Sequence, residues 1–166
     1  MTCNGRFLVA TPLITDPNFA HTVVYVYAHD EGAGAAGVVV NRPTEEPTVD
    51  YLPEWRSVLA APPAVFWGGP VAQESGVVIV VRDGAIELIA DSEPPTGVRA
   101  RLFVGQAGWG PEQLEMELAE GAWLVVDARP DDVLSAFPEG LWSAILRRQG
   151  GRQAMWATHP LDPSAN

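Results

Sequence analysis

"FVGQAGWGPEQLEMEL", residues 103–118, contains a short apolar run, a glycine-rich turn and the opening of a helix. This order of elements is typical of nucleotide sites, where a glycine-rich turn cradles phosphate. A P-loop continues its second glycine with Lys and then Ser or Thr, whereas Gly110 is followed here by Pro111 and Glu112. Neither residue supplies the lysine amine or the hydroxyl, and the Glu112 carboxylate would repel a phosphate at the helix N-terminus.

We therefore predict that the stretch is architectural. It should form a strand over 101–105, a turn at the glycines and a helix over 111–120. Pro111 suits the first helical position, where its missing N–H costs nothing. Glu112 would face the positive end of the helix, and Gly121 would end the helix.

Outward from this stretch, runs rich in Val, Ile and aromatic residues predict strands. These runs are 6–11, 22–28, 37–41, 64–69, 76–82, 85–90, 101–105 and 122–126. Asp83-Gly84 predicts a type I′ hairpin between two of them, and "HDEGAGAAG" predicts a looser hairpin loop. Further short helices are expected around 54–60 and over 130–137 and 139–149, the last ending at Gly150-Gly151. Strands dominate and helices come late, which predicts an α+β fold with a largely antiparallel sheet, in one domain over 1–166.

Composition narrows the classes of function. The 166 residues carry a net charge of −11, with arginine but no lysine among ten basic residues, and a single cysteine, Cys3. An acidic chain is poorly suited to direct nucleic-acid binding, which depends on neutralising phosphates. No signal peptide and no membrane-spanning run is visible, so we expect a soluble cytoplasmic protein. Arg147 and Arg148 sit at the end of a predicted helix, where cations complement the helix dipole.

The sequence offers little chemistry for catalysis or for a metal. No GxSxG nucleophile elbow is present. His21 and His29 flank one predicted strand, and eight strand residues span roughly 26 Å at about 3.3 Å each, too far to share a metal. We predict no catalytic residues, no metal and no cofactor.

One polar cluster has the features of a ligand or partner site: Asp16, Asn41, Arg42, Gly69 and Gln113. Each lies at an element end or a turn, where sites are commonly built. Structural roles are open for the same residues: Asp16 would cap a turn and Asn41 would occupy a left-handed bend. Arg42 precedes a proline and is forced to be extended, which would aim its guanidinium at a carboxylate. Trp55 lies in the proline-broken segment 42–63 and is a candidate anchor for a partner.

The chain resembles the YqgE/AlgH family of bacterial proteins almost from end to end. The resemblance rests on "FLVATPLITDPNFAHTVVYVYAHDEGAGAAGVVVNRPT" (7–44), "FWGGPVAQESGVVI" (66–79), "GWGPEQLEMELAEGAWLV" (108–125) and "HPLDPSAN" (159–166). Members of the family often carry Gly where this chain has Glu112. The resemblance implies a strongly bent, barrel-like, largely antiparallel sheet flanked by a few helices. It also implies a transcriptional-regulator label, which is linked to alginate control in one branch.

Two functions remain open from the sequence. The first is a non-enzymatic binding protein with a regulatory role, whose partner is another protein. The second is a small-molecule hydrolase that uses a polar pocket around Asp16, Asn41 and Arg42. Direct DNA binding is disfavoured by charge, and no helix-turn-helix is visible.

Overall fold

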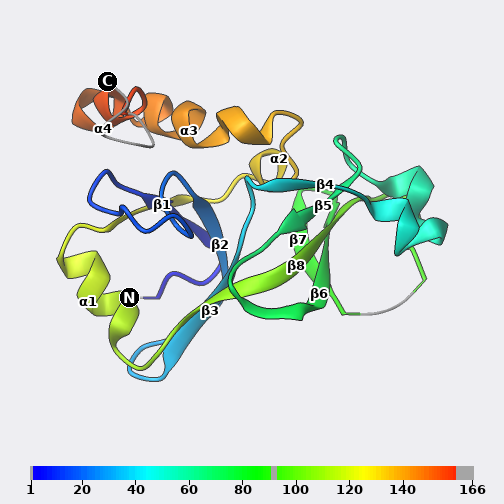
Figure 1. The fold of residues 1–166 in the computed structure, drawn as a ribbon, viewed down its shortest axis with the longest axis horizontal. Helices are drawn as coiled ribbons and strands as arrows, with labels where there is room; N and C mark the ends of the chain where they lie inside the picture. The colour runs from blue at the N-terminus through cyan, green and yellow to red at the C-terminus, as the bar shows by residue number, and fades with distance from the viewer. Residues whose placement is uncertain (1, 91–92, 160–166) are drawn as a thin grey trace.

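The computed structural model describes residues 2–90 and 93–159 (Figure 1). The strands are β1 (Arg6–Ala10), β2 (Val23–Asp30), β3 (Gly34–Val39), β4 (Pro43–Pro47), β5 (Ala64–Trp67), β6 (Val71–Arg82), β7 (Ala85–Ile89), β8 (Arg99–Trp109) and β9 (Trp123–Asp127). The helices are α1 (Gln113–Ala119), α2 (Pro130–Val133), α3 (Leu141–Gln149) and α4 (Gly151–Trp156), with short 3-10 helices η1 (Thr48–Asp50), η2 (Pro53–Val58) and η3 (Pro138–Gly140). The predicted α+β class is confirmed.

The long strand β8 joins two groups of strands into one sheet. Its residues 107–109 pair with β3, and β3 leads on through β2 and β1 to β9. Its residues 99–106 pair with β6, and 103–104 pair with β5 on the other side. Figure 1 shows β8 running from the end of β3 into the group formed by β5, β6 and β7. The pairings are antiparallel except for β5 with β8, so the sheet is largely antiparallel as predicted.

The expectation of a barrel-like sheet was wrong, because the sheet is not closed. Within the described residues, its nine strands run in the order β4-β5-β8-β3-β2-β1-β9, with β6 and β7 branching from β8. The end strands β4 and β9 are not paired with each other. β4 has only five residues and a proline at each end, Pro43 and Pro47, and proline cannot donate a ladder hydrogen bond. Such a strand is suited to an edge.

The strands β1 and β2 are apolar on both sides because both sides of the sheet are covered. Phe7, Val9, Val23 and Tyr25 belong to one core, which also contains the buried face of α3. Their neighbours in sequence belong to a second core with Leu114 of α1: Leu8, Ala10, Val24 and Val26. Side chains alternate between the two faces of a strand, so this double burial explains the unbroken valine run of the sequence. Figure 1 shows α3 and α4 along one side of the molecule and α1 on another.

The predicted hairpin over 76–90 is confirmed, whereas the proline-broken segment differs from expectation. Arg82 pairs with Ala85, and Asp83 and Gly84 have φ values of 51° and 76°. The segment 42–63 contains strand β4, which was not predicted, and the expected helix is the 3-10 helix η2. Trp55 is only 2% exposed and packs in a third core with Val78 and Leu102. Trp55 is therefore not a free anchor for a partner.

The glycine-rich stretch forms strand rather than turn. Gly105 and Gly108 lie inside β8, which continues to Trp109, and α1 begins at Gln113. Pro111 is therefore not at the first helical position. The cause is Glu112, which precedes α1 with a φ of 65°, in the left-handed region. The chain turns at 110–112, where the Gln113 N–H donates to the Gly110 carbonyl at 3.1 Å.

The left-handed conformation of Glu112 predicts a stabilising substitution. A left-handed residue with a side chain is strained by about 1–2 kcal/mol, and glycine loses about 0.5–1 kcal/mol more backbone entropy on folding. We expect Glu112→Gly to raise the free energy of unfolding in urea by about 0.5–1 kcal/mol. The matched control is Glu120→Gly, since Glu120 is also exposed but has a φ of −79° and should lose stability. Equal effects of the two substitutions would contradict this account.

The C-terminal helices also differ from the sequence prediction. The predicted helix over 139–149 is divided into η3 and α3. Gly150 does end α3, with a φ of 70°, but Gly151 begins the short helix α4 instead of remaining in a loop.

Candidate functional site

The segment 11–22, between β1 and β2, forms the first wall of the candidate site. Asp16 caps its turn: Oδ1 accepts a hydrogen bond from the Asn18 N–H at 2.9 Å, and its carbonyl accepts from the N–H groups of Phe19 and Ala20. The structural role considered for Asp16 is therefore present. The Asp16 side chain is exposed, which leaves its carboxylate within reach of a ligand.

Arg42, in the connection between β3 and β4, binds the same 11–22 segment. Its Nη1 and Nη2 donate to the carbonyls of Asn18 and Ala20, both at 2.9 Å, and its guanidinium carbon lies 5.3 Å from the centre of the Trp67 ring. The expectation that Arg42 aims at a carboxylate was wrong, because main-chain carbonyls take its donors. Burial lowers the pKa of Arg42, and the charge of Asp16 opposes that shift.

Asn41 is buried and fixes the start of β2. Its Oδ1 accepts from the Val23 N–H at 3.0 Å, and its Nδ2 donates to the His21 carbonyl at 2.9 Å. The left-handed residue of this bend is His21, with a φ of 60°, and not Asn41 as expected. Asp16, Asn41 and Arg42 thus meet at one segment, but the polar atoms of Asn41 and Arg42 bond the main chain.

Gly69 lies between β5 and β6, where the chain crosses β8. Its φ is 150°, and a Cβ at this position would lie 2.2 Å from the carbonyl carbon and oxygen of Gln106. Gly105, across the crossing, is equally tight, since its Cβ would lie 2.2 Å from the Gly69 carbonyl oxygen. The glycines permit two backbones to touch.

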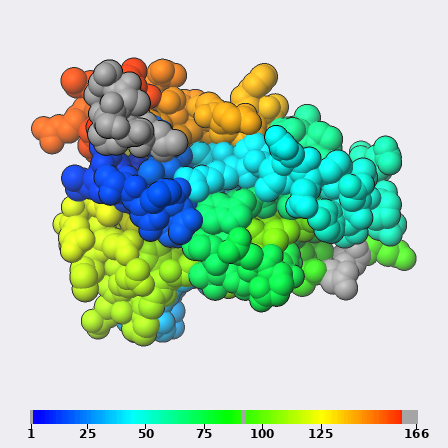
Figure 2. All heavy atoms as spheres, viewed as in Figure 1, coloured from blue at the N-terminus to red at the C-terminus, as the bar shows by residue number. Residues whose placement is uncertain are grey.

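A groove of about 350 Å³ separates the 11–22 segment from α1. Its lining comprises Leu13, Ile14, Thr15, Asp16, Phe19, Gly108, Trp109, Gln113, Glu117, Ala122 and Trp123. We call it the Trp groove. Figure 2 shows the 11–22 segment, in blue, beside the yellow-green region that contains α1. Of the five predicted site residues, Asp16 and Gln113 line this groove.

Glu117 connects the aromatic wall of the Trp groove to α1. Its Oε1 accepts the indole N–H groups of Trp109 at 3.0 Å and Trp123 at 2.8 Å, and its Oε2 accepts from Gln113 Nε2 at 2.9 Å. The two indoles meet edge to face at 5.9 Å, and Phe19 packs against both. These contacts of Glu117 were not predicted from the sequence, although the quoted stretch "GWGPEQLEMELAEGAWLV" (108–125) contains Trp109, Gln113 and Glu117 together.

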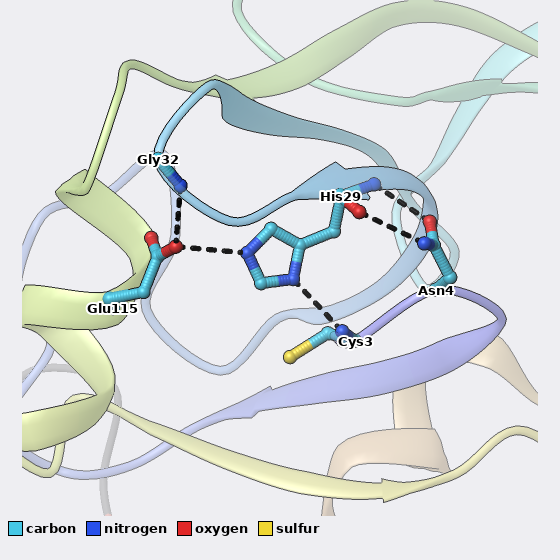
Figure 3. Close-up of polar contacts among 5 residues, drawn as sticks. All are labelled: Cys3, Asn4, His29, Gly32 and Glu115. Atoms are coloured by element: carbon cyan, nitrogen blue, oxygen red, sulfur yellow. Dashed lines mark hydrogen bonds and ion pairs between the residues drawn. The ribbon is translucent and has the colours of Figure 1, made fainter. Parts of the chain in front are cut away.

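A second polar network joins Glu115 of α1 to the N-terminal residues Cys3 and Asn4 through His29 (Figure 3). The Cys3 N–H donates to His29 Nδ1 at 2.9 Å, and Asn4 exchanges two hydrogen bonds with the His29 main chain. His29 Nε2 lies 3.4 Å from Glu115 Oε2, which also accepts from the Gly32 N–H at 3.3 Å. Because Nδ1 is an acceptor, the neutral ring carries its proton on Nε2, toward Glu115. The network connects four segments: the N-terminal residues, β2, the loop at Gly32 and α1.

The Cys3 thiol is buried beside this network, and burial raises its pKa. Thiolate is the reactive form, so the thiol should be unreactive in the native protein. We expect native Cys3 to react with Ellman's reagent at pH 8 at least about a hundredfold more slowly than the unfolded chain, because reaction requires local opening.

The single cysteine makes this measurement unambiguous. His29→Ala should accelerate the reaction by removing the acceptor for the Cys3 N–H, whereas Asp30→Ala, at an exposed neighbour, should not. Complete labelling of the native protein within mixing time would contradict the burial of Cys3.

A profile of AlgH-like domains matches residues 7–96 and 82–154. The chain belongs to the AlgH-like family. The YqgE/AlgH resemblance noted from the sequence is thereby confirmed.

Relatives match this AlgH-like chain over nearly its whole length. A UPF0301 protein of Streptomyces coelicolor is 47% identical and aligns with 98% of this chain and 94% of its own. A UPF0301 protein of Thermobifida fusca is 39% identical, over 100% and 96% of the two chains.

Two solved structures have the same fold. The crystal structure of protein DIP2367 from Corynebacterium diphtheriae superposes with a TM-score of 0.86 at 27% identity, over 93% of this chain and 91% of that one. The solution structure of AlgH from Pseudomonas aeruginosa gives a TM-score of 0.70 at 29% identity, over 96% and 95%.

The side chains and helix lengths in residues 2–90 and 93–159 bear on whether the chain could hold a metal or cross a membrane with a helix. No group of three or more His, Cys, Asp or Glu side chains there has the arrangement of a metal site. None of the helices in the same residues is long and apolar enough to cross a bilayer.

Proposed function

We propose that this AlgH-like protein is a cytoplasmic, non-enzymatic binding protein with a regulatory role, and that its Trp groove receives a basic segment of a partner protein. The observation that carries the proposal is the make-up of the groove. Its wall is aromatic, from Phe19, Trp109 and Trp123, and its carboxylates are Asp16 and Glu117. Aromatic faces and carboxylates together favour a cationic group such as the side chain of Arg or Lys.

The polar groups of the groove support binding rather than catalysis. The Glu117 carboxylate accepts three N–H groups. The Gln113 side chain donates to Glu117 and accepts from the Gly110 N–H at 2.9 Å. These side chains are rigid and preorganised, which is what a recognition surface requires. The hydrolase alternative requires Asp16, Asn41 and Arg42 to face one pocket, whereas Asn41 and Arg42 bond main-chain groups of residues 18–23.

The indole N–H groups of Trp109 and Trp123 give a direct test by 15N NMR. The probes are N-acetyl-arginine amide and an arginine-rich peptide, with a glutamate-rich peptide of equal length for comparison. We expect saturable shifts at both indoles with the basic probes only. Asp16→Asn should weaken binding at least about threefold through loss of one charge pair, and Glu45→Gln, at an exposed acid outside the groove, should not.

Two results would overturn the proposal. One is the absence of indole shifts with the basic peptide at millimolar concentration. The other is equal weakening by Asp16→Asn and Glu45→Gln, which would mean that the acidic chain attracts cations without a site.

A further inference from the structure

Three arginines line a hollow of about 290 Å³ beside β9, remote in sequence from one another. Arg6 begins β1, Arg129 follows β9, and Arg148 lies in the last turn of α3. The remaining lining includes Val126, Asp127 and Ile145. We call this the arginine hollow. It was not predicted from sequence, where Arg148 was interpreted as a complement to the helix dipole.

The convergence of these arginines is not a consequence of general basicity. The chain has ten basic residues against 21 acidic ones. Bringing three positive charges to one hollow is unfavourable unless counter-charges or a ligand balance them. The protein itself supplies two counter-charges, Asp127 and Asp132.

Arg148 is held in place by one of these counter-charges. Its Nη1 and Nη2 donate to the two carboxylate oxygens of Asp132, each at 2.7 Å. These hydrogen bonds raise the pKa of Arg148 and fix the plane of its guanidinium. The remaining N–H donors of that rigid group are available to a ligand.

Arg6 and Arg129 are less completely satisfied. Arg6 makes an ion pair of 3.2 Å from Nη2 to Asp127, whose side chain is 92% exposed, while Arg6 Nε is buried without a hydrogen-bond partner. Arg129 is exposed, and its side chain makes no hydrogen bond or ion pair within residues 2–90 and 93–159, although its carbonyl accepts from the N–H groups of Asp132 and Val133. A buried N–H without a partner is costly, and an incoming acceptor would relieve that cost.

We propose that the arginine hollow binds a small phosphate monoester, with the phosphate between Arg6, Arg129 and Arg148. Guanidinium groups match phosphate oxygens in bidentate geometry. The hollow has the volume of roughly ten liquid waters at about 30 Å³ each, which admits a phosphate and a small organic group. The ligand displaces Asp127 from Arg6, so Asp127 competes with the phosphate.

This site is independent of the Trp groove, because the two share no lining residue. The test is titration of the full chain with glycerol 3-phosphate at constant ionic strength, followed by calorimetry and by the Arg Nε NMR signals. Inorganic phosphate and acetate are the comparison anions. We expect saturable binding of glycerol 3-phosphate with a shift of the Arg6 Nε–H signal, weaker binding of inorganic phosphate and none of acetate.

Variants with opposite expected signs make the test specific. Arg129→Gln should weaken binding about tenfold, and Arg129→Lys should weaken it by less, since it keeps the charge without the guanidinium fork. Asp127→Asn should tighten binding about threefold by removing the competing carboxylate. The controls are Arg147→Gln, next to Arg148 but outside the lining, and Asp131→Asn, an exposed acid that pairs with Arg99 at 3.0 Å. Both should change the affinity less than about twofold.

The outcomes separate the alternatives. Loss of affinity in Arg129→Gln together with a gain in Asp127→Asn supports the proposal. Three results would overturn it. One is the absence of saturable binding with glycerol 3-phosphate at up to about twenty millimolar, which corresponds to very weak affinity. The others are equal effects of the site and control variants, and acetate binding as tightly as the phosphate ester.

Discussion

Gly69→Ala should destabilise the protein by more than about 3 kcal/mol, the scale of severe backbone strain combined with a steric clash. The added Cβ would lie 2.2 Å from the carbonyl carbon of Gln106 and 2.5 Å from the Ala107 nitrogen. Both are main-chain atoms of β8, which cannot move without breaking its pairing with β6 or β3. The φ of 150° adds strain for any residue with a Cβ.

Urea denaturation followed by circular dichroism measures this effect. The control is Gly108→Ala, because a Cβ on Gly108 meets nothing within 4 Å and its φ is not positive. Gly108→Ala should stay within about 1 kcal/mol of the unmodified chain. Insoluble Gly69→Ala protein beside soluble Gly108→Ala protein also supports the expectation. If the free energy of unfolding of Gly69→Ala were within about 1 kcal/mol of the parent value, the close approach to β8 would not explain why this position is glycine.

Arg101→Ala should cost about 3–5 kcal/mol, the range for breaking a buried charged network. Arg101 on β8 is 1% exposed, and its Nη1 and Nη2 donate to the carbonyls of Ser135 at 3.0 Å and Ala61 at 2.8 Å. Its guanidinium carbon lies 4.1 Å from the centre of the Phe66 ring. Burial lowers the pKa of Arg101 to about 10, which is consistent with a cation held by carbonyls and an aromatic ring.

Three variants test whether the donors of Arg101 or its volume stabilise the fold. Arg101→Met fills most of the space but leaves two carbonyls without their donor, so it should cost about half as much as the alanine variant. Arg99→Ala, two residues away on the same strand, removes only an exposed pair with Asp131 and should cost less than about 0.5 kcal/mol. If the Arg101→Met protein were more stable than the parent, the free-energy cost of burying the charge would exceed the stabilisation from its hydrogen bonds.

Much of the strand pattern could be predicted from sequence because it depends on local chemistry. Asp83-Gly84 specifies its turn through two residues that tolerate positive φ, and the alternating cores follow from a period of two along β1 and β2. Strand β4 was not predictable in this way, since Pro43 and Pro47 disfavour a strand and only pairing with β5 creates one. Glu112 misled the helix prediction, because it adopts a positive φ, a conformation typical of glycine.

The candidate site was only partly predictable, because its partners are distant along the chain. The extended conformation before Pro43 restricts the backbone of Arg42, yet nothing local indicates that Asn18 and Ala20 receive its guanidinium. Gln113 and Glu117 are four residues apart on α1, a spacing that predicts their contact. Trp123 reaches Glu117 from the following strand, and the arginine hollow joins residues from three separate elements.

Because β8 pairs with β3, β5 and β6, it determines what would happen if this chain were divided into two polypeptides. A gene split between residues 90 and 93 would place β3, β5 and β6 in one fragment and the strand that all three pair with in the other. Each fragment would then expose strand edges that only the other can cover. The two fragments are therefore suited to a complementation reporter, whose signal would depend on β8 returning to its three neighbours.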